Sequence, residues 1–175
     1  MTTPKLSPQK LINLLSLKPL EIEGGFFRRT YYAGERFSPG TLPARYPPGE
    51  HRFASAIYYL LTNDPDCFSS MHRLPTDEIY HFYLGDPVEM LQLFEDGHSR
   101  RVVLGQDLLA GQMVQYTAAK NAWQGSYLLP GGSFALLGTT MSPAFESGDF
   151  EEGLRSNLTR LYPQEQPMIT RLTRR

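Results

Sequence analysis

The segment Met71–Gly85 holds the densest group of side chains that could do chemistry. It contains two histidines, His72 and His81, and two adjacent carboxylates, Asp77 and Glu78. Imidazole nitrogens and carboxylate oxygens bind zinc, iron, manganese, nickel or copper, and an open coordination position then activates a substrate. Without a metal, the same groups do acid–base work, because histidine titrates near neutral pH and burial raises the pKa of a carboxyl group. The segment therefore predicts a metal site or a metal-free acid–base site.

Strand alternation decides which of these side chains share a face. In a regular strand over residues 78–84, Glu78 and Tyr80 face one way and His81 faces the other. A carboxylate among apolar and aromatic neighbours needs a partner when it is buried, so Glu78 is expected to face a pocket. His81 then supports the pocket from behind or points away from it. The residues expected to be catalytic are Glu78, His72 and Tyr80. Further candidates for contacting a ligand are Gln124, Gln115, Gln92, Arg28, Trp123 and His81.

The surrounding sequence predicts a mostly β protein with one flanking helix. Ser7 followed by Pro8 begins a helix of about residues 7–18, because the hydroxyl caps free amides and proline at the first helical position loses no hydrogen bond. From Gly24 onward, aromatic and β-branched runs alternate with turns rich in glycine, proline, asparagine and aspartate. The strands predicted from these runs are 26–32, 53–62, 78–84, 88–94, 101–104, 112–117, 123–129 and 133–141.

These strands are expected to pair antiparallel, because the connections between them are short. A set of this size must hide its edges, and a jelly-roll barrel does so while leaving room for one small ligand. The proline-rich segment 37–51 predicts a loop that could cover the mouth of a pocket. Asp149 is expected to cap a short helix through Glu152. We therefore predict an all-β jelly-roll barrel over about residues 24–142, with an N-terminal helix and a short C-terminal helical segment.

Length and composition narrow the possible functions. The chain has 175 residues, which suits one domain over residues 1–175. Its 17 basic and 18 acidic residues leave a formal charge of −1, which gives no support to binding of nucleic acid or of an anionic membrane surface. The sequence contains neither a membrane-spanning apolar run nor the apolar core of a secretory signal. The single cysteine, Cys67, excludes an internal disulfide and fits the reducing cytoplasm.

The sequence resembles the cupin superfamily at two signatures. In the first, His72 stands at the first histidine, and Glu78 and Gly85 keep the expected gap of six residues. Leu74 takes the place of the second histidine, and Gln124 replaces the histidine of the second signature. The resemblance implies that His72, Glu78 and Gln124 are the residues that would hold a divalent metal ion. Glutamine is a weak neutral ligand, so the two replacements are expected to lower metal affinity.

A closer resemblance covers nearly the whole chain and is to a small group of single-domain, RmlC-like cupins. The segments that carry it are 24–31 (GGFFRRTY), 56–61 (AIYYLL), 77–83 (DEIYHFY), 104–105 (LG), 123–124 (WQ) and 149–151 (DFE). It implies a double-stranded β-helix, the cupin jelly-roll barrel, that forms a homodimer. It also implies structural kinship to sugar-nucleotide epimerases and to auxin-binding or seed-storage cupins, without implying one reaction.

The sequence thus predicts a cupin barrel that binds a small organic molecule, sugar-like or acidic. In a metal-free isomerase or epimerase, Glu78 or a histidine would take a proton beside a carbonyl, and Tyr80 would return one from the opposite face. An arginine would stabilise the oxyanion, and the alternation in strand 26–32 puts Arg28 on one face and Arg29 on the other. In a metal-dependent enzyme, His72, Glu78 and Gln124 would hold the ion.

Two further alternatives involve no reaction. The same pocket could capture a ligand without turnover, as a binding or sensory module. The protein could also be a structural dimer whose pocket is filled by side chains such as Phe82 and Trp123.

Overall fold

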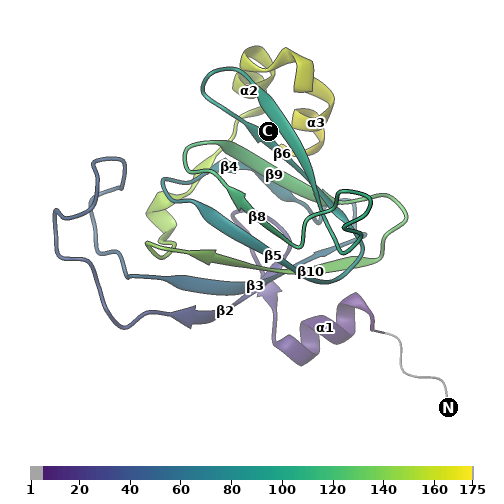
Figure 1. The fold of residues 1–175 in the computed structure, drawn as a ribbon, viewed down its shortest axis with the longest axis horizontal. Helices are drawn as coiled ribbons and strands as arrows, with labels where there is room; N and C mark the ends of the chain where they lie inside the picture. The colour runs from purple at the N-terminus through teal and green to yellow at the C-terminus, as the bar shows by residue number, and fades with distance from the viewer. Residues whose placement is uncertain (1–5, 175) are drawn as a thin grey trace.

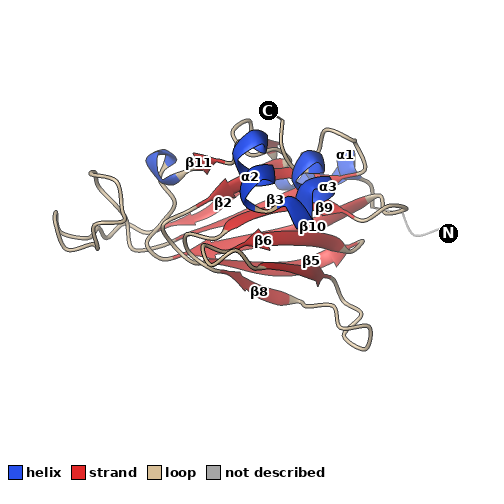
Figure 2. Ribbon diagram, turned by 90° about the horizontal axis from the view of Figure 1, so that it is seen from above, coloured by secondary structure: helices blue, strands red, loops and turns tan. Residues whose placement is uncertain are grey.

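The computed structural model describes residues 6–174, which form two antiparallel sheets packed against each other (Figures 1 and 2). In these residues, one sheet has six strands in the order β1 (Lys18–Pro19), β2 (Phe26–Tyr32), β3 (Ser55–Thr62), β10 (Phe134–Met141), β5 (Glu78–Gly85) and β8 (Gln115–Ala118). The other has five, in the order β11 (Glu151–Glu152), β4 (Ser69–Arg73), β9 (Trp123–Leu128), β6 (Val88–Leu93) and β7 (Ser99–Leu104).

The order of the strands is that of a jelly roll. β10 lies between β3 and β5, and β9 lies between β4 and β6, so the chain crosses repeatedly from one sheet to the other. Every pairing between the named strands is antiparallel. The predicted all-β barrel with its flanking helices is therefore confirmed. Two sheets that close on one another bury one face of every strand, which is why this arrangement is stable.

The sequence analysis missed β4, which carries His72. Its sequence, SSMHR, has only one large apolar residue and shows no alternation of apolar and polar positions. The strand is nevertheless buried on both faces, with Met71 pointing outward into a second core and His72 pointing inward. Tertiary packing therefore makes this strand where local sequence pattern does not.

The hydrophobic side chains form separate inner and outer cores. Between the sheets, a cluster that includes Tyr59, Tyr80 and Met90 fills much of the barrel. On the outer face of the five-stranded sheet, α2 (Arg155–Leu161) and α3 (Gln166–Arg171) cover a cluster that contains Met71, Leu91, Leu93, Leu158 and Ile169. These helices lie against β6 and β9 in Figure 1. Strands β4, β6 and β9 are therefore packed on both faces and hold their inward side chains firmly.

The N-terminal helix α1 (Pro8–Leu15) packs on the outer face of the six-stranded sheet. Ser7 caps it, as predicted, by accepting a hydrogen bond from the backbone of Lys10. The helix ends at Leu15 rather than near residue 18, because Ser16 adopts the left-handed conformation with φ of 51°. No helix within residues 6–174 has the length and apolar character needed to cross a membrane.

Of the predictions for two irregular segments, one is confirmed and one is wrong. The proline-rich segment 37–51 forms the predicted loop and projects from the body of the protein in Figure 1. The predicted helix from Asp149 to Glu152 is wrong. Ser147–Asp149 forms a single 3-10 turn (η1), and Glu151–Glu152 pairs with β4 as β11. The Asp149 carboxylate accepts from the Glu146 backbone at 3.0 Å and so caps the start of this turn.

Gly24 and Gly25 fix the turn that connects β1 to β2. Their φ angles are +111° and +71°, in the region that favours glycine. A Cβ on Gly24 would lie 2.1 Å from the carbonyl oxygen of Phe68, and a Cβ on Gly25 would lie 2.9 Å from that of Leu60. The turn can therefore approach β3 and the start of β4 only because both residues lack a side chain.

Gly24→Ala is expected to destabilise the protein more than the same change at Gly111. Backbone strain at positive φ costs about 1–3 kcal/mol at either position. Only Gly24 adds a clash, worth about 1–3 kcal/mol more, because nothing lies within 4 Å of a Cβ on Gly111. Urea unfolding of both variants measures the difference, and equal losses of stability would contradict the close approach described here.

Candidate functional site

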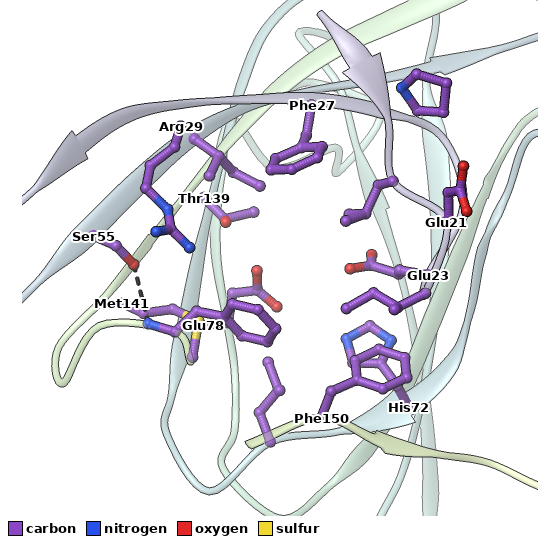
Figure 3. A pocket seen from close by; sticks show the side chains of 16 residues that line it. Glu21, Glu23, Phe27, Arg29, Ser55, His72, Glu78, Thr139, Met141 and Phe150 are labelled. Carbon is purple, nitrogen blue, oxygen red and sulfur yellow. Dashed lines mark hydrogen bonds between the residues drawn. The ribbon is translucent and has the colours of Figure 1, made fainter. Parts of the chain in front are cut away.

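A pocket of about 320 Å³ lies in the barrel at the end where β5 begins and β10 finishes (Figure 3). This volume is at the lower end of the range for pockets that bind small molecules. Both sheets contribute to its walls, together with the turn 19–23 and the segment around 145–150. The apolar side chains of the lining include Leu20, Phe27, Ile57, Met141, Phe145 and Phe150.

The loop 37–51 does not cover this pocket, contrary to what the sequence suggested. None of its residues is among those that line the cavity. Phe82 and Trp123 do not fill the pocket either, because Phe82 packs in the barrel core and Trp123 packs in the outer core. The pocket is therefore open space, bounded by the N-terminal turn and by Phe150.

Glu78 is buried at the start of β5, and two side chains donate hydrogen bonds to one of its oxygens. Its Oε2 accepts from Tyr80 Oη at 3.1 Å and from Gln124 Nε2 at 2.8 Å. Gln124 belongs to β9 in the opposite sheet, so this bond joins the two walls of the barrel. In Figure 3 the Glu78 carboxyl points into the cavity.

The pKa of Glu78 is raised above its usual range. Burial is the largest cause, because an apolar surrounding disfavours the charged form, and the negative charge of Glu23 adds to it. Hydrogen bonding from Thr139 and Tyr80 acts in the opposite direction, as does a positive charge on His72 when its ring is protonated. Glu78 therefore keeps its proton to higher pH than an exposed glutamate does, and it can present that proton to a bound molecule.

His72 is held in one orientation beside Glu78. Its Nδ1 lies 2.7 Å from the carbonyl oxygen of Ser70, which can only accept, so Nδ1 carries a hydrogen. Its Nε2 lies 3.3 Å from Gln124 Nε2 and accepts from that amide. The ring stacks on Phe150, with the centroids 5.1 Å apart. His72 thus presents a fixed, hydrogen-bond-accepting imidazole next to the Glu78 carboxyl.

The structure places His72, Glu78 and Gln124 side by side, and it puts Tyr80 and Gln92 behind them. Tyr80 is only 1% exposed and does not line the pocket, so it cannot return a proton to a ligand as the sequence suggested. Tyr80 is two residues after Glu78 on β5, so strand alternation puts both side chains on the same face, with Tyr80 deeper in the barrel. Gln92 is also inside the barrel, where its Oε1 accepts from Tyr116 Oη.

Three predicted ligand contacts face away from the pocket. His81 lies on the outer face of the six-stranded sheet, where its Nε2 is 3.2 Å from Thr140 Oγ1. Gln115 donates from Nε2 to His81 Nδ1 at 3.2 Å and lies on that outer face as well. Arg28 also points outward, over the ring of Tyr58. Strand alternation explains all three, because each is an odd number of residues from a side chain that points inward.

Trp123 is the fourth predicted contact that lies elsewhere. It is the residue before Gln124 on β9, so it faces the outer core, where Arg73 lies over its ring at 4.7 Å. On β2 the inward arginine is Arg29, one residue after the predicted Arg28, and it lines the pocket with Phe27. The sequence left both arginines possible, because it does not show which face of β2 turns inward.

Glu23 is the pocket residue that the sequence analysis missed. It lies in the turn before Gly24 and is half-buried. Ser69 Oγ donates to its Oε1 at 2.6 Å. In Figure 3 Glu23 and Glu78 project into the cavity from facing sides. The only signal in the sequence was its place before two glycines, which mark a turn but not the pocket that the turn enters.

The donors present do not fit a bound metal ion. His72 Nε2 and Glu78 Oε2 both face the NH₂ group of Gln124, which has no lone pair to offer. Buried, apolar Leu74 lines the same pocket. Within residues 6–174, no three His, Cys, Asp or Glu side chains are grouped so that they could hold a metal ion. The site is a hydrogen-bonded cluster of His72, Glu78 and Gln124.

The jelly-roll topology, with Glu78 and His72 turned into one end of the barrel, is that of a cupin-type protein. The family model described as Cupin superfamily (DUF985) matches residues 9–152. The chain belongs to this family.

Solved structures agree with this assignment. A hypothetical protein from Leishmania major aligns with a TM-score of 0.83 and 26% identity, over 96% of this chain and 99% of that one. A crystal structure from Shewanella oneidensis aligns with a TM-score of 0.84 and 29% identity, over 97% and 99%. A cupin 2 conserved barrel domain protein from Rhodopseudomonas palustris shares the fold, with a TM-score of 0.52 and 11% identity over 90% and 86%. A search of curated proteins found no match.

Removing or adding divalent metal is expected to leave the stability of the protein unchanged. A metal that binds only the folded state at one hundred times its Kd would add about 2.7 kcal/mol, so a real site would be easy to detect. Thermal unfolding with EDTA, Zn²⁺ or Mn²⁺, together with elemental analysis of the purified protein, makes the measurement. Stoichiometric metal whose removal lowers the unfolding midpoint would contradict this account.

Glu78→Gln is expected to change the pH dependence of stability. Because the folded-state pKa of Glu78 is raised, the stability linked to its proton is complete below the unfolded pKa and is lost as pH rises through the folded pKa. The variant escapes this loss, so its stability relative to the natural protein should increase from acid to neutral pH. Urea unfolding across this range tests the slope, with Glu35→Gln at an exposed position as the control. A difference that stays constant with pH would contradict the raised pKa.

Proposed function

We propose that the protein binds a small, largely apolar organic molecule in the barrel pocket and transfers a proton at Glu78 without a metal ion. The observation that carries the proposal is the Glu78 carboxyl, which is buried, has a raised pKa and points into an apolar cavity. Perturbed carboxyl groups in apolar clefts are typical of acid–base sites. Isomerase or epimerase chemistry, in which a proton moves beside a carbonyl, fits this arrangement.

The remaining polar groups suit such a reaction. His72 Nε2 accepts a hydrogen bond beside Glu78. Arg29 also lines the pocket, as an exposed side chain whose guanidinium lies 4.3 Å from the centre of the Tyr32 ring. Arginine stabilises the negative charge that develops on a carbonyl oxygen when a neighbouring carbon loses a proton. The mostly apolar lining favours a ligand with fewer hydroxyl groups than a sugar, because a sugar would leave most of its hydrogen-bonding groups without partners.

We further propose that the protein is a cytoplasmic homodimer. Exposed apolar side chains gather on the loop between β7 and β8, where Leu108 is 63% and Leu109 is 102% exposed. A second copy of the chain would remove such side chains from water. The single cysteine, Cys67, is buried and unpaired, as suits a reducing compartment.

Filling the pocket is expected to abolish ligand binding. Ile57→Trp adds bulk to the lining, whereas Leu14→Trp adds the same ring at a position on α1 that is 71% exposed and is the control. After incubation with a pool of small carbonyl compounds and organic acids, native mass spectrometry should show a bound molecule on the natural protein and on the control, but not on Ile57→Trp. The same spectra should show two subunits.

The fate of the bound molecule separates catalysis from capture. Turnover that Glu78→Gln abolishes supports the proposed proton transfer, whereas binding without any product would make the protein a binding module. Equal retention of the molecule by Ile57→Trp, with unfolding midpoints that show all variants to be folded, would place the site outside this pocket.

A further inference from the structure

Of the three glutamates that line the pocket, Glu21, Glu23 and Glu78, the last two face one another from opposite walls. Glu78 comes from β5, and Glu23 comes from the turn between β1 and β2. Figure 3 shows them projecting toward the same open space from facing sides. With His72 they do not form a group close enough to share a metal ion. The space between them is therefore available to a ligand that both can reach.

The position of Glu23 is built into the fold. Its backbone carbonyl accepts from Ser70 N at 2.9 Å, and its side chain accepts from Ser69 Oγ at 2.6 Å, so β4 holds it at two points. Tyr59 Oη donates to the carbonyl of the next residue, Gly24, at 3.0 Å. A surface turn without a role would need none of this support. The arrangement matches the general need of a reactive group for neighbours that fix its rotamer.

The two groups also interact electrostatically. The charge of Glu23 is the second largest cause of the raised pKa of Glu78. Two carboxyl groups that face one another favour the state in which one is protonated and the other ionised. Burial is the largest cause for Glu78, whereas Glu23 is half-buried and accepts a hydroxyl hydrogen bond. Glu78 is therefore the member of the pair that holds a proton, and it faces the Glu23 carboxyl across the pocket.

We infer that Glu23 is the second acid–base residue of the site and that the pair inverts a carbon beside a carbonyl group. This inference rests on the proposed function and adds a second catalytic residue to it. Glu23 replaces Tyr80, which is buried behind Glu78 and cannot reach a ligand.

The step balances without an oxidant, a reductant or a leaving group. The carboxylate of Glu23 takes the proton from one face of the carbon, and the C–H electron pair moves into an enolate whose oxygen carries the negative charge. Arg29 lines the pocket where its charge can stabilise that oxygen. Glu78 then gives its proton to the opposite face of the same carbon and becomes ionised. The product is the mirror-image centre, and the reverse reaction starts from the exchanged protonation states.

The class of substrate follows from the lining. The molecule needs an acidic C–H beside a carbonyl, an apolar body for the walls formed by residues such as Phe27, Ile57 and Phe150, and an oxygen for Arg29. Small branched or aromatic keto acids and ketones meet these requirements. The volume of about 320 Å³ suits a molecule at the small end of the range for such ligands.

Proton sharing between the two groups can be measured without a substrate. Isotope-edited NMR of labelled glutamate carboxyls in the full chain should show the midpoint of Glu78 falling in Glu23→Gln, because the opposing charge is gone. Glu35→Gln, an exposed glutamate outside the pocket, should leave it unchanged. A Glu78 midpoint that is the same in Glu23→Gln and in the natural protein would overturn the pairing.

Catalysis is tested in heavy water with one enantiomer of the α-keto acid that corresponds to isoleucine. The asymmetric carbon of this keto acid lies beside its ketone. The protein should accelerate inversion, and the inverted product should carry deuterium while the remaining reactant does not, which is the signature of two separate acid–base groups. Glu23→Gln and Glu78→Gln should each slow inversion by about 100-fold or more, and Glu35→Gln should not. If only Glu78→Gln slows it, Glu23 is not the second group, although the proposed function stands. If the natural protein causes no inversion, the inferred substrate class is wrong.

Discussion

The burial of the Glu78 carboxyl between two sheets is the constraint on which the site depends. An ionised carboxylate in an apolar surrounding loses most of its hydration, so the group must gain hydrogen bonds, keep its proton, or do both. Here Tyr80 and Gln124 supply two hydrogen bonds to one oxygen, and Thr139 also hydrogen-bonds to the carboxyl. The arrangement stabilises the carboxyl without neutralising it through an ion pair, which keeps its proton available for transfer.

The jelly-roll topology makes this arrangement possible. Glu78 and Gln124 come from different sheets, and the crossing connections place β5 opposite β9. The helices α2 and α3 cover the outer face of β4, β6 and β9, so the inward side chains of those strands sit on a support packed on both faces. The turn at Gly24 then closes the open end of the barrel with Glu23 and apolar side chains. Each layer thus fixes part of a cavity whose polar groups lie among apolar walls.

The parts of the fold and of the site that follow a regular sequence pattern could be predicted from the sequence. Alternating strands and turn residues predicted the barrel. Strand parity put Glu78 and His81 on opposite faces, and the cupin resemblance correctly sent Glu78 inward. Glu23 could not be found this way, because it lies in an irregular turn whose position depends on contacts with β3 and β4. The strand that carries His72 was missed because it is polar in sequence but buried by packing from both sides. Arg29 could not be chosen over Arg28, because both faces of β2 carry an arginine and only tertiary structure shows which one is inside.

The most direct test of the account is the ionisation of Glu78 in the ligand-free protein, followed by infrared spectroscopy. A protonated carboxyl group has a carbonyl stretch distinct from that of a carboxylate, and the band that is missing from Glu78→Gln belongs to this residue. We predict that this band persists as pH rises past the point at which exposed glutamates ionise. A band that disappears together with those of the exposed glutamates would contradict the central claim that the barrel holds a proton at Glu78.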